Sequence, residues 1–284
     1  MTTPLQLPDV TLCCVDTRST GLALEAMLKC MAKAQFGDVV LIGPPKWGQA
    51  NAVPNTVRYV EISPLNGIDA YSTFLIKELG KYITTSHVLI VQWDGFILNP
   101  QYWQNDFLSY DYIGSPWYHG GHPGMVGNGG FSLRSKRLLE ALTLVSPLAN
   151  EPEDMAICVT LRQRLENEHA IHFAPLETAR AFGCEYGPWL EAFGFHGMHN
   201  FAHFMSDKEL FDWVKNAPTY ILTSEHARKL IKELMFNGRA KSAIYLIHKR
   251  SNLTGWTRDQ FILFARAIIR LTTQRKEIPT RGTG

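Results

Sequence analysis

Short apolar runs alternate with longer stretches of helical periodicity along the first third of the chain. The runs that predict buried strands are residues 10–15, 38–42, 57–62 and 88–91. Between them, apolar side chains recur every three or four positions in residues 21–35 and 71–83, which predicts helices. Strands that alternate with helices of this length favour an α/β fold, with a Rossmann-like, mostly parallel sheet sandwiched by helices.

Polar residues stand where two of these predicted strands end. Asp16, Thr17 and Arg18 follow the first strand, and Asp94 follows the fourth within a few positions. Ligands of open α/β sheets bind beyond the carboxyl ends of the strands. We therefore expect the two polar segments to meet at one edge of the sheet and to line a ligand site.

The middle of the chain is richer in loops. Residues 110–114 and 129–133 are short apolar segments on either side of a loop of glycine, histidine and aromatic residues at 115–128. Helices are predicted at residues 135–144 and from Pro152 to about residue 168, where proline and two acids occupy the first turn. The region ends with a predicted strand and a glycine-flanked aromatic segment, at residues 171–174 and 193–197.

Beyond residue 205 the pattern becomes helical and no strand is predicted. The expected helices are residues 207–215, 225–236, 241–248 and 257–272. We therefore expect two domains, an α/β domain at residues 1–205 and an all-helical C-terminal appendage at residues 206–284.

Charge is divided unevenly between these parts. The net charge is +2, but residues 226–284 hold 13 Lys and Arg against 3 Asp and Glu, and the other 225 residues hold 15 against 23. A basic region of this kind favours contact with an anionic membrane or a nucleic acid, although a solvated helical face has the same composition. In the last helix Phe261, Phe264 and Ile268 share one face, which suits a membrane surface, the first domain or a second subunit.

The compartment is predicted from what the sequence lacks. No apolar run reaches the 18 residues of a membrane span, and the first residues do not have the layout of a secretory signal. The five cysteines include no CxxC pair, which argues against a disulfide framework or a cysteine zinc site. We expect a cytoplasmic protein, with peripheral attachment to the inner face of the membrane as a further possibility.

Four segments carry residues suited to chemistry, and each has a plainer structural interpretation. Asp94 suits a divalent cation such as Mg²⁺ or Mn²⁺, but a strand-end aspartate is also a common turn residue. His196, between Gly194 and Gly197, suits Mn²⁺, or it is a buried hydrogen-bonded histidine.

The third segment is rich in glycine, and the fourth holds paired acids. Asn128, Gly129 and Gly130 allow a ligand to approach the backbone and offer an amide to sugar hydroxyls, or they form a simple turn. Glu153 and Asp154 can supply a general base, or they cap the helix that begins there.

The order of these segments resembles that of a known enzyme class. The motifs are VLIVQWDGF, YDYIGSPW, GNGGFSLRS, the Glu153–Asp154 pair and FGFHG, and the resemblance spans residues 10–200. They resemble metal-dependent glycosyltransferases of the GT-A type, especially the uncharacterised, DUF5672-like bacterial family associated with capsule or lipopolysaccharide. They also resemble a galactosyltransferase pattern of DxD, a GG-S segment, an ED base and a metal-binding HG.

The resemblance implies a role for each candidate residue. Asp16, Thr17 and Arg18 would line the nucleotide base and ribose, and Asn128, Gly129 and Gly130 would border the donor sugar. Asp94 and His196 would bind Mn²⁺ or Mg²⁺. Asp154, or failing it Glu153, would be the general base. Apart from the resemblance, the loop before the glycine-rich segment offers Trp117, Tyr118, His119 and His122 to stack on sugar rings or close over the donor, or it is simply an exposed loop.

The implied reaction is transfer of a sugar from a nucleotide-diphospho-sugar to an acceptor hydroxyl, with inversion. The acceptor would be a glycan or a lipid-linked molecule in polysaccharide or glycolipid synthesis. One departure weakens the metal assignment, because Gln92 stands at the first acidic position of the DxD motif. Two alternatives remain open: a glycosyltransferase acting on nucleic acid, and a non-catalytic nucleotide-sugar-binding module.

Overall fold

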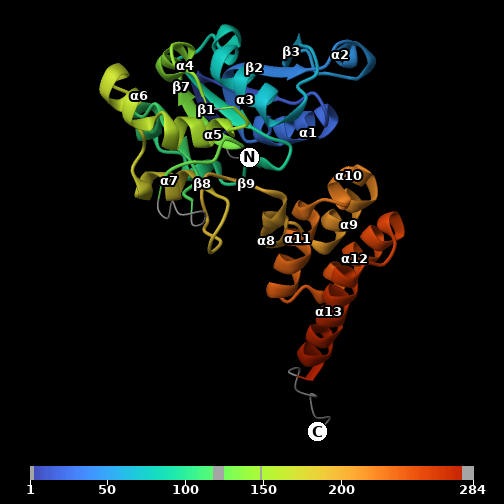
Figure 1. The fold of residues 1–284 in the computed structure, drawn as a ribbon. Coiled ribbons are helices and arrows are strands. Elements are labelled where there is room, and N and C mark those ends of the chain that lie inside the picture. The colour runs from blue at the N-terminus through green and yellow to red at the C-terminus, as the bar shows by residue number, and fades with distance from the viewer. Residues whose placement is uncertain (1–2, 118–124, 148, 277–284) are drawn as a thin grey trace. The chain divides into compact units, whose positions relative to one another are not determined.

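The computed structural model describes residues 3–117, 125–147 and 149–276. The chain divides into two compact units, Met1–His196 and Gly197–Gly284 (Figure 1). The boundary expected near residue 205 lies inside the second unit, because the short helices η5 (Met198–Asn200) and α8 (Phe201–Phe204) pack against later helices of that unit. Each unit is described by itself below.

The first unit is built on a six-stranded sheet with the strand order β3-β2-β1-β4-β7-β6. Five strands run parallel to one another, and β7 runs antiparallel to both of its neighbours. The strands are β1 Leu5–Val15, β2 Ala34–Gly43, β3 Arg58–Glu61, β4 His87–Val91, β6 Tyr112–Gly114 and β7 Phe131–Ser135. The mostly parallel α/β sheet predicted from the apolar runs is confirmed.

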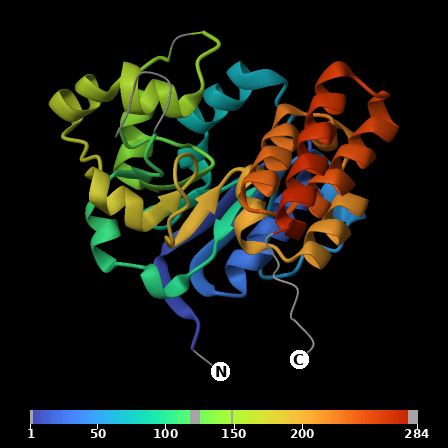
Figure 2. The same cartoon turned by 90° about the horizontal axis from the view of Figure 1, so that it is seen from below.

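Helices cover both faces of this sheet (Figures 1 and 2). Helix α1 (Thr20–Met31) packs on β1, β2 and β4. On the other face lie α3 (Gly67–Lys77), the 3-10 turn η1 (Leu79–Tyr82) and α4 (Lys136–Thr143). Alternate strand residues such as Cys13, Val40 and Ile90 meet Phe74, Leu75 and Leu139 there. Burial of each aliphatic side chain stabilises the folded state by about 1.5–3 kcal/mol. The helices on both faces therefore hold the sheet and its edge in place.

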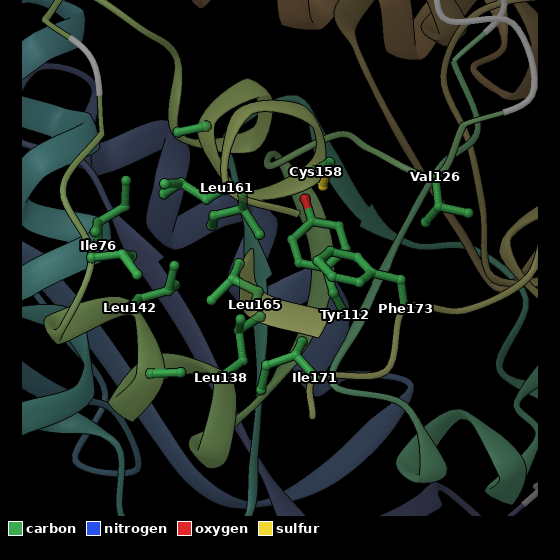
Figure 3. Packing of buried hydrophobic residues seen from close by; sticks show 14 of the residues in the cluster. Ile76, Tyr112, Val126, Leu138, Leu142, Cys158, Leu161, Leu165, Ile171 and Phe173 are labelled. Carbon is green, nitrogen blue, oxygen red and sulfur yellow. The ribbon is translucent and has the colours of Figure 1, made fainter. Parts of the chain in front are cut away.

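A second apolar cluster packs behind β6 and β7 (Figure 3). It joins Tyr112 of β6 to Leu138 and Leu142 of α4 and to Leu161 and Leu165 from the segment after Asp154. This segment consists of α5 (Glu153–Met155), a π-helical turn at Ala156–Thr160 and α6 (Arg162–His169). The single helix predicted over residues 152–168 is therefore interrupted by a wider turn.

A small three-stranded sheet with the order β5-β9-β8 completes the first unit. Strand β5 (Gly95–Ile97) runs antiparallel to β9 (Gly194–His196), and β8 (Gly183–Cys184) runs parallel to β9. Phe96 and Phe195 pack edge to face, with ring centroids 4.7 Å apart. Because β5 follows Asp94 directly, this sheet carries His196 to the end of β4.

The strand predicted at residues 171–174 is reduced to a single bridge between Phe173 and Tyr112. The backbone of Ala174 donates to Tyr112, but the N–H of His172 donates to the Asp111 carboxylate at 2.8 Å. The Asp111 side chain thus takes the N–H of His172 that the next backbone hydrogen bond of a strand would use, and the strand pairing stops there. The remaining elements of the unit are α2 Trp47–Ala50, η2 Pro100–Tyr102, η3 Asn105–Ser109 and α7 Leu176–Phe182.

The second unit is helical throughout the part that the structure describes. Its further helices are α9 Asp207–Asn216, α10 Thr219–Leu222, α11 Glu225–Phe236, α12 Ala240–Thr254 and α13 Arg258–Lys276. Ser206 begins α9 with a reciprocal capping box to Glu209, and Leu230, Leu234 and Leu246 fill the core. Among the described helices, none has the length and apolar character that a membrane span requires.

Candidate active site at the carboxyl edge of the sheet

The antiparallel course of β7 brings two motifs together. Val91, the last residue of β4, pairs with Phe131, the first residue of β7. The segment that leaves β4 and the glycine-rich segment that enters β7 therefore lie at the same edge of the sheet. Strand β1 also ends at this edge, at Val15, so Asp16 follows it there.

Asp94, Gln92 and His196 form the centre of this edge. The pairing of Gly95 with His196 between β5 and β9 places the imidazole over the end of β4. Its Nε2 lies 3.4 Å from Oδ1 of Asp94 and 3.1 Å from Oε1 of Gln92. Asp94 is buried, with 3% of its surface exposed. Two residues predicted as metal ligands, 102 positions apart in the chain, are thus neighbours in the structure.

The position of Gln92 is fixed from its other end. Its Nε2 donates to the hydroxyl of Tyr71 at 3.0 Å, so its Oε1 faces His196. Burial raises the pKa of Tyr71 well above its ordinary value, and the nearby charge of Glu153 raises it further. Tyr71 therefore stays a neutral hydroxyl that can accept from the amide.

Glu185 is a member of this site that the sequence did not reveal. Its Oε1 lies 3.0 Å from Nδ1 of His196, and it follows the two-residue strand β8 in a loop without a motif. Burial lowers the pKa of His196, but Asp94 and Glu185 outweigh this effect and raise that pKa well above its ordinary value. The carboxylate at Nδ1 fixes the direction of Nε2, as in metal-binding histidines, and a cation would bind Nε2 in place of its proton.

The glycine-rich segment packs directly against these side chains. A Cβ on Gly130 would lie 2.2 Å from Nε2 of His196, and one on Gly129 would lie 1.9 Å from Oε1 of Glu153. Asn128 adopts a left-handed conformation with φ 64°, and its Oδ1 accepts from the N–H groups of Gly130 and Phe131. The Asn128 side chain thus shapes this turn. Its buried Nδ2 has no hydrogen-bond partner among the described residues.

The two acids after Pro152 occupy different environments. Glu153 is buried and forms an ion pair with the fully buried Arg134 at 2.9 Å. Asp154 accepts from the N–H groups of Gly129 and Met155, at 3.2 and 2.9 Å. Burial raises the pKa of Asp154 to about 6, and the charges of Glu153 and Glu185 add to this, although the two N–H groups oppose it. Asp154 is thus the acid whose proton exchanges near neutral pH.

The polar residues after β1 shape the start of α1. Oδ1 of Asp16 accepts from the N–H groups of Arg18 and Ser19, and Oγ1 of Thr17 accepts from the N–H of Leu65. Burial raises the pKa of Asp16, its two N–H donors lower it, and the charge of Asp94 raises it again, so both carboxylates belong to one region. Their roles toward a nucleotide, with that of Arg18, stay predictions.

The loop before the glycine-rich segment differs from expectation at Trp117. This side chain is 5% exposed and packs in the second apolar cluster, against the backbone of Gly127. It therefore cannot stack on a sugar in this arrangement, so the stacking role predicted for it is wrong, and closure over a donor stays a prediction. Tyr118, His119 and His122 lie outside the described residues.

The donor set at the edge suits a divalent cation. Within the described residues, no group of three or more His, Cys, Asp and Glu side chains has the arrangement of a metal site. The set here is mixed, with a carboxylate oxygen of Asp94, an imidazole nitrogen of His196 and an amide oxygen of Gln92. Such oxygen and imidazole donors fit Mn²⁺. The surrounding carboxylates of Asp16, Asp154 and Glu185 give the site a negative charge that favours a cation.

A match to a protein family agrees with the resemblance seen in the motifs. The model of the family described as "Protein of unknown function (DUF5672)" matches residues 55–196. Among curated proteins, none matches this chain.

Two solved structures are similar to it at low identity. One is the mannosyltransferase PcManGT from Pyrobaculum calidifontis in complex with GDP-Man and Mn²⁺, at 10% identity and a TM-score of 0.42, over 98% of this chain and 90% of that one. The other is an active-site mutant of LgtC, at 10% identity and a TM-score of 0.38, over 66% of this chain and 86% of that one.

Proposed function

This chain belongs to the DUF5672 family, and we propose that it is a GT-A-type glycosyltransferase that moves a sugar from a nucleotide-diphospho-sugar to an acceptor hydroxyl. The single observation that carries the proposal is the meeting of Asp94, Gln92 and His196 beside Gly129, Gly130 and Asp154. A cation site and a base with a raised pKa, side by side at the carboxyl edge of the sheet, are what this reaction needs.

The first requirement is to bind a diphosphate at an edge crowded with carboxylates. A divalent cation, when bound, supplies the positive charge that offsets the two phosphates as the nucleotide leaves. Gln92, Asp94 and His196 would hold it. Glu185 and Tyr71 fix two of these side chains from behind, through Nδ1 of His196 and Nε2 of Gln92. In the proposal Asp16, Thr17 and Arg18 line the nucleotide.

The second requirement is to remove a proton from the acceptor. In the proposal Asp154 takes the proton of the acceptor hydroxyl as the oxygen attacks the anomeric carbon. A bond forms between that oxygen and the anomeric carbon, the bond from this carbon to the phosphate oxygen breaks, and the nucleoside diphosphate leaves. Attack from the face opposite the leaving group inverts the configuration. Glu153 serves the fold in this scheme, because Arg134 occupies its carboxylate.

The close approach of the glycine-rich segment supports a sugar site at the same place. Gly129 and Gly130 leave no room for a Cβ, so their backbone lies against Glu153 and His196. The buried Nδ2 of Asn128 is a donor that an oxygen of the donor sugar can satisfy. The raised pKa of Asp154 favours an enzyme over a non-catalytic sugar-binding module, since binding alone needs no base.

Ligand-dependent stability tests donor and metal together. A panel of nucleotide-diphospho-sugars is screened by thermal shift with and without Mn²⁺, because a ligand that binds only the folded state raises the Tm. We expect one donor class to stabilise the protein, and more strongly with Mn²⁺. Asp94→Ala should remove the Mn²⁺-dependent part and abolish transfer. The control Asp212→Ala changes an exposed acid paired with Lys215 and should behave as the wild type.

A negative screen has a clear meaning. If no nucleotide-sugar shifts the Tm of the wild-type protein, or if Asp94→Ala responds to donor and Mn²⁺ as the wild type does, the proposed function is wrong.

Once the screen has identified a donor, acceptors are tested with that donor. Transfer to a glycan or a lipid-linked hydroxyl is expected, whereas transfer to nucleic acid would support the alternative acceptor.

A further inference from the structure

Helix α13 in the second unit is apolar on two opposite faces. One face is buried: Leu263 and Ala267 pack into the helical core beside α12. The other face is exposed, with Phe261 at 57% and Ile269 at 61% exposure. An α-helix turns by about 100° per residue, so Ile262 and Ile268 join these two on one stripe that extends about 12 Å along the axis.

Further apolar groups extend this stripe at both ends. At the start of α13, Trp256 stacks on Phe261 with ring centroids 4.9 Å apart. Toward the other end, Phe236 at the end of α11 is 75% exposed and lies with Ile269 on the wall of a hollow of about 500 Å³. Exposed apolar groups that gather in this way often mark an interaction site. The side-by-side course of α12 and α13 can be followed in Figure 1.

Basic side chains border this apolar surface. Lys232, Arg266 and Arg270 line the same hollow as Phe236 and Ile269, and Glu233 is the one acid among its lining residues. Nη1 of Arg270 donates to the carbonyl of Met235 at 2.7 Å, which holds the guanidinium at the rim. Glu233 lies 3.7 Å from His203, but burial and the charges of His199 and Arg239 lower the pKa of that imidazole, so Glu233 is outnumbered by the three basic residues rather than neutralised. The surface therefore combines exposed apolar groups with net positive charge.

We propose that this face of α13, together with Phe236, docks onto an anionic phospholipid surface. The aromatic and aliphatic side chains enter the boundary between headgroups and acyl chains, and Lys232, Arg266 and Arg270 meet the lipid phosphates. The aromatic pair Trp256 and Phe261 suits this boundary, since such rings concentrate there in membrane-associated proteins. Docking does not depend on the proposed reaction and requires no donor.

The charge of the surface argues against the other occupants. Two copies of this face would bring Arg266 and Arg270 against the same arginines, which repel each other. A nucleic acid would meet the arginines but leave Ile262, Ile268 and Ile269 without apolar contacts, because its outer surface is charged phosphate. A lipid surface offers phosphates and acyl chains together, and so satisfies both kinds of side chain at once.

Vesicle flotation of the full-length chain tests the proposal. We expect binding to phosphatidylcholine vesicles that contain about 30 mol% phosphatidylglycerol, because anionic headgroups attract basic segments. We expect no binding to vesicles of phosphatidylcholine alone. Salt should weaken the binding, because exposed charges are screened. The double variant Phe261→Ser, Ile269→Ser should bind at least about tenfold more weakly, and Arg266→Glu should weaken binding chiefly at low salt.

Matched controls separate docking from a general loss of structure. Ile68→Ser removes an isoleucine of α3 that is also 58% exposed, and it should bind vesicles as the wild type does. The Tm of the double variant should stay close to that of the wild type, because both side chains are exposed and only the stacking of Phe261 on Trp256 is lost. Equal binding by wild type and double variant would overturn the proposal. So would a double variant that dissociates from a dimer formed by the wild type, since the face would then be covered by a second copy.

Discussion

Glu185 contacts Nδ1 of His196 at 3.0 Å, and this contact leaves Nε2 as the nitrogen that faces Asp94 and Gln92. The two ring nitrogens of a histidine are chemically distinct, and the partner of one sets what the other does. Glu185 therefore acts at a distance from the ligand, by orienting the imidazole. It is a positioning residue in the proposed site.

Removal of Glu185 should weaken cation binding while the fold persists. We expect Glu185→Ala to bind Mn²⁺ about 10–100-fold more weakly than the wild type, and Glu185→Gln to fall between them, because the amide can still accept from Nδ1 but lacks the charge. Titration of Mn²⁺ by electron paramagnetic resonance measures this directly. Glu191→Ala is the control, since Glu191 accepts a hydrogen bond from the hydroxyl of Tyr102 at an exposed position. Unchanged Mn²⁺ affinity in Glu185→Ala would remove Glu185 from the site.

Gly130 should tolerate no side chain. Alanine at this position would place its Cβ 2.2 Å from Nε2 of His196, so the imidazole or the turn must move. We expect Gly130→Ala to lose both Mn²⁺ binding and transfer. Gly21→Ala is a matched control, because a Cβ there meets only the Trp47 ring at 3.9 Å. The Mn²⁺ affinities of the two variants decide the matter, and equal affinities would show that the space beside His196 is not required.

Turnover should depend on the ionisation of Asp154. A general base must be deprotonated, and burial raises the pKa of Asp154 to about 6, so kcat should fall as the pH drops below about 6 and level off above it. Asp154→Asn should bind the donor as the wild type does and lose about 10²–10⁴-fold in kcat above pH about 6, and the difference from the wild type should shrink at lower pH. Rates at saturating donor and Mn²⁺ check this. Wild-type turnover in Asp154→Asn would assign the base elsewhere.

The carboxylate of Asp154 should also make the free energy of unfolding depend on pH. The pKa of Asp154 is raised from 3.8 to about 6 on folding, so the folded protein holds a proton between these values that the unfolded chain has lost. The contribution of this group to stability is thus fully present below pH about 4 and is lost as the pH rises through about 6. The free energy of unfolding of wild type relative to Asp154→Asn should fall over this window, measured by urea denaturation. A difference that is constant with pH would contradict the raised pKa.

Glu153 should matter for the fold. Its loss would leave the guanidinium of Arg134 fully buried without its ion-pair partner, which costs about 3–5 kcal/mol. We expect Glu153→Ala to destabilise the protein by this amount in chemical denaturation. Glu168→Ala breaks the exposed pair with Arg164 and should change stability by less than about 1 kcal/mol. A stable Glu153→Ala variant without transfer activity would instead return Glu153 to a catalytic role.

The sheet could be predicted because its strands are buried on both faces. Residues 88–91 form a continuous apolar run, and in the structure every residue of β4 is buried between two layers of helices. The position of Asp94 at the carboxyl edge follows from that run and from the parallel topology. Short elements such as β5, β8 and β9 have two or three residues each, too few for a period to be visible in the sequence.

The parts that could not be predicted depend on contacts between distant residues. Glu185 stands in a loop, and only the pairing of β8 with β9 brings it to His196. Trp117 is of a residue type that stacks on sugars, but its ring packs against the backbone of Gly127 and is buried. In residues 171–174, the Asp111 carboxylate takes the N–H that a strand would have used. In each case a tertiary partner decides between alternatives that are equal in the local sequence.

The pairing of β5 with β9 has a consequence for how the protein refolds. Gln92 and His196 are 104 positions apart, and no local segment brings them together. Closing so long a loop is slow compared with helix formation, which takes about a microsecond. After dilution from denaturant, the helical signal should therefore recover before the affinity for Mn²⁺ does. The delay between the two recoveries measures how long His196 takes to reach the end of β4.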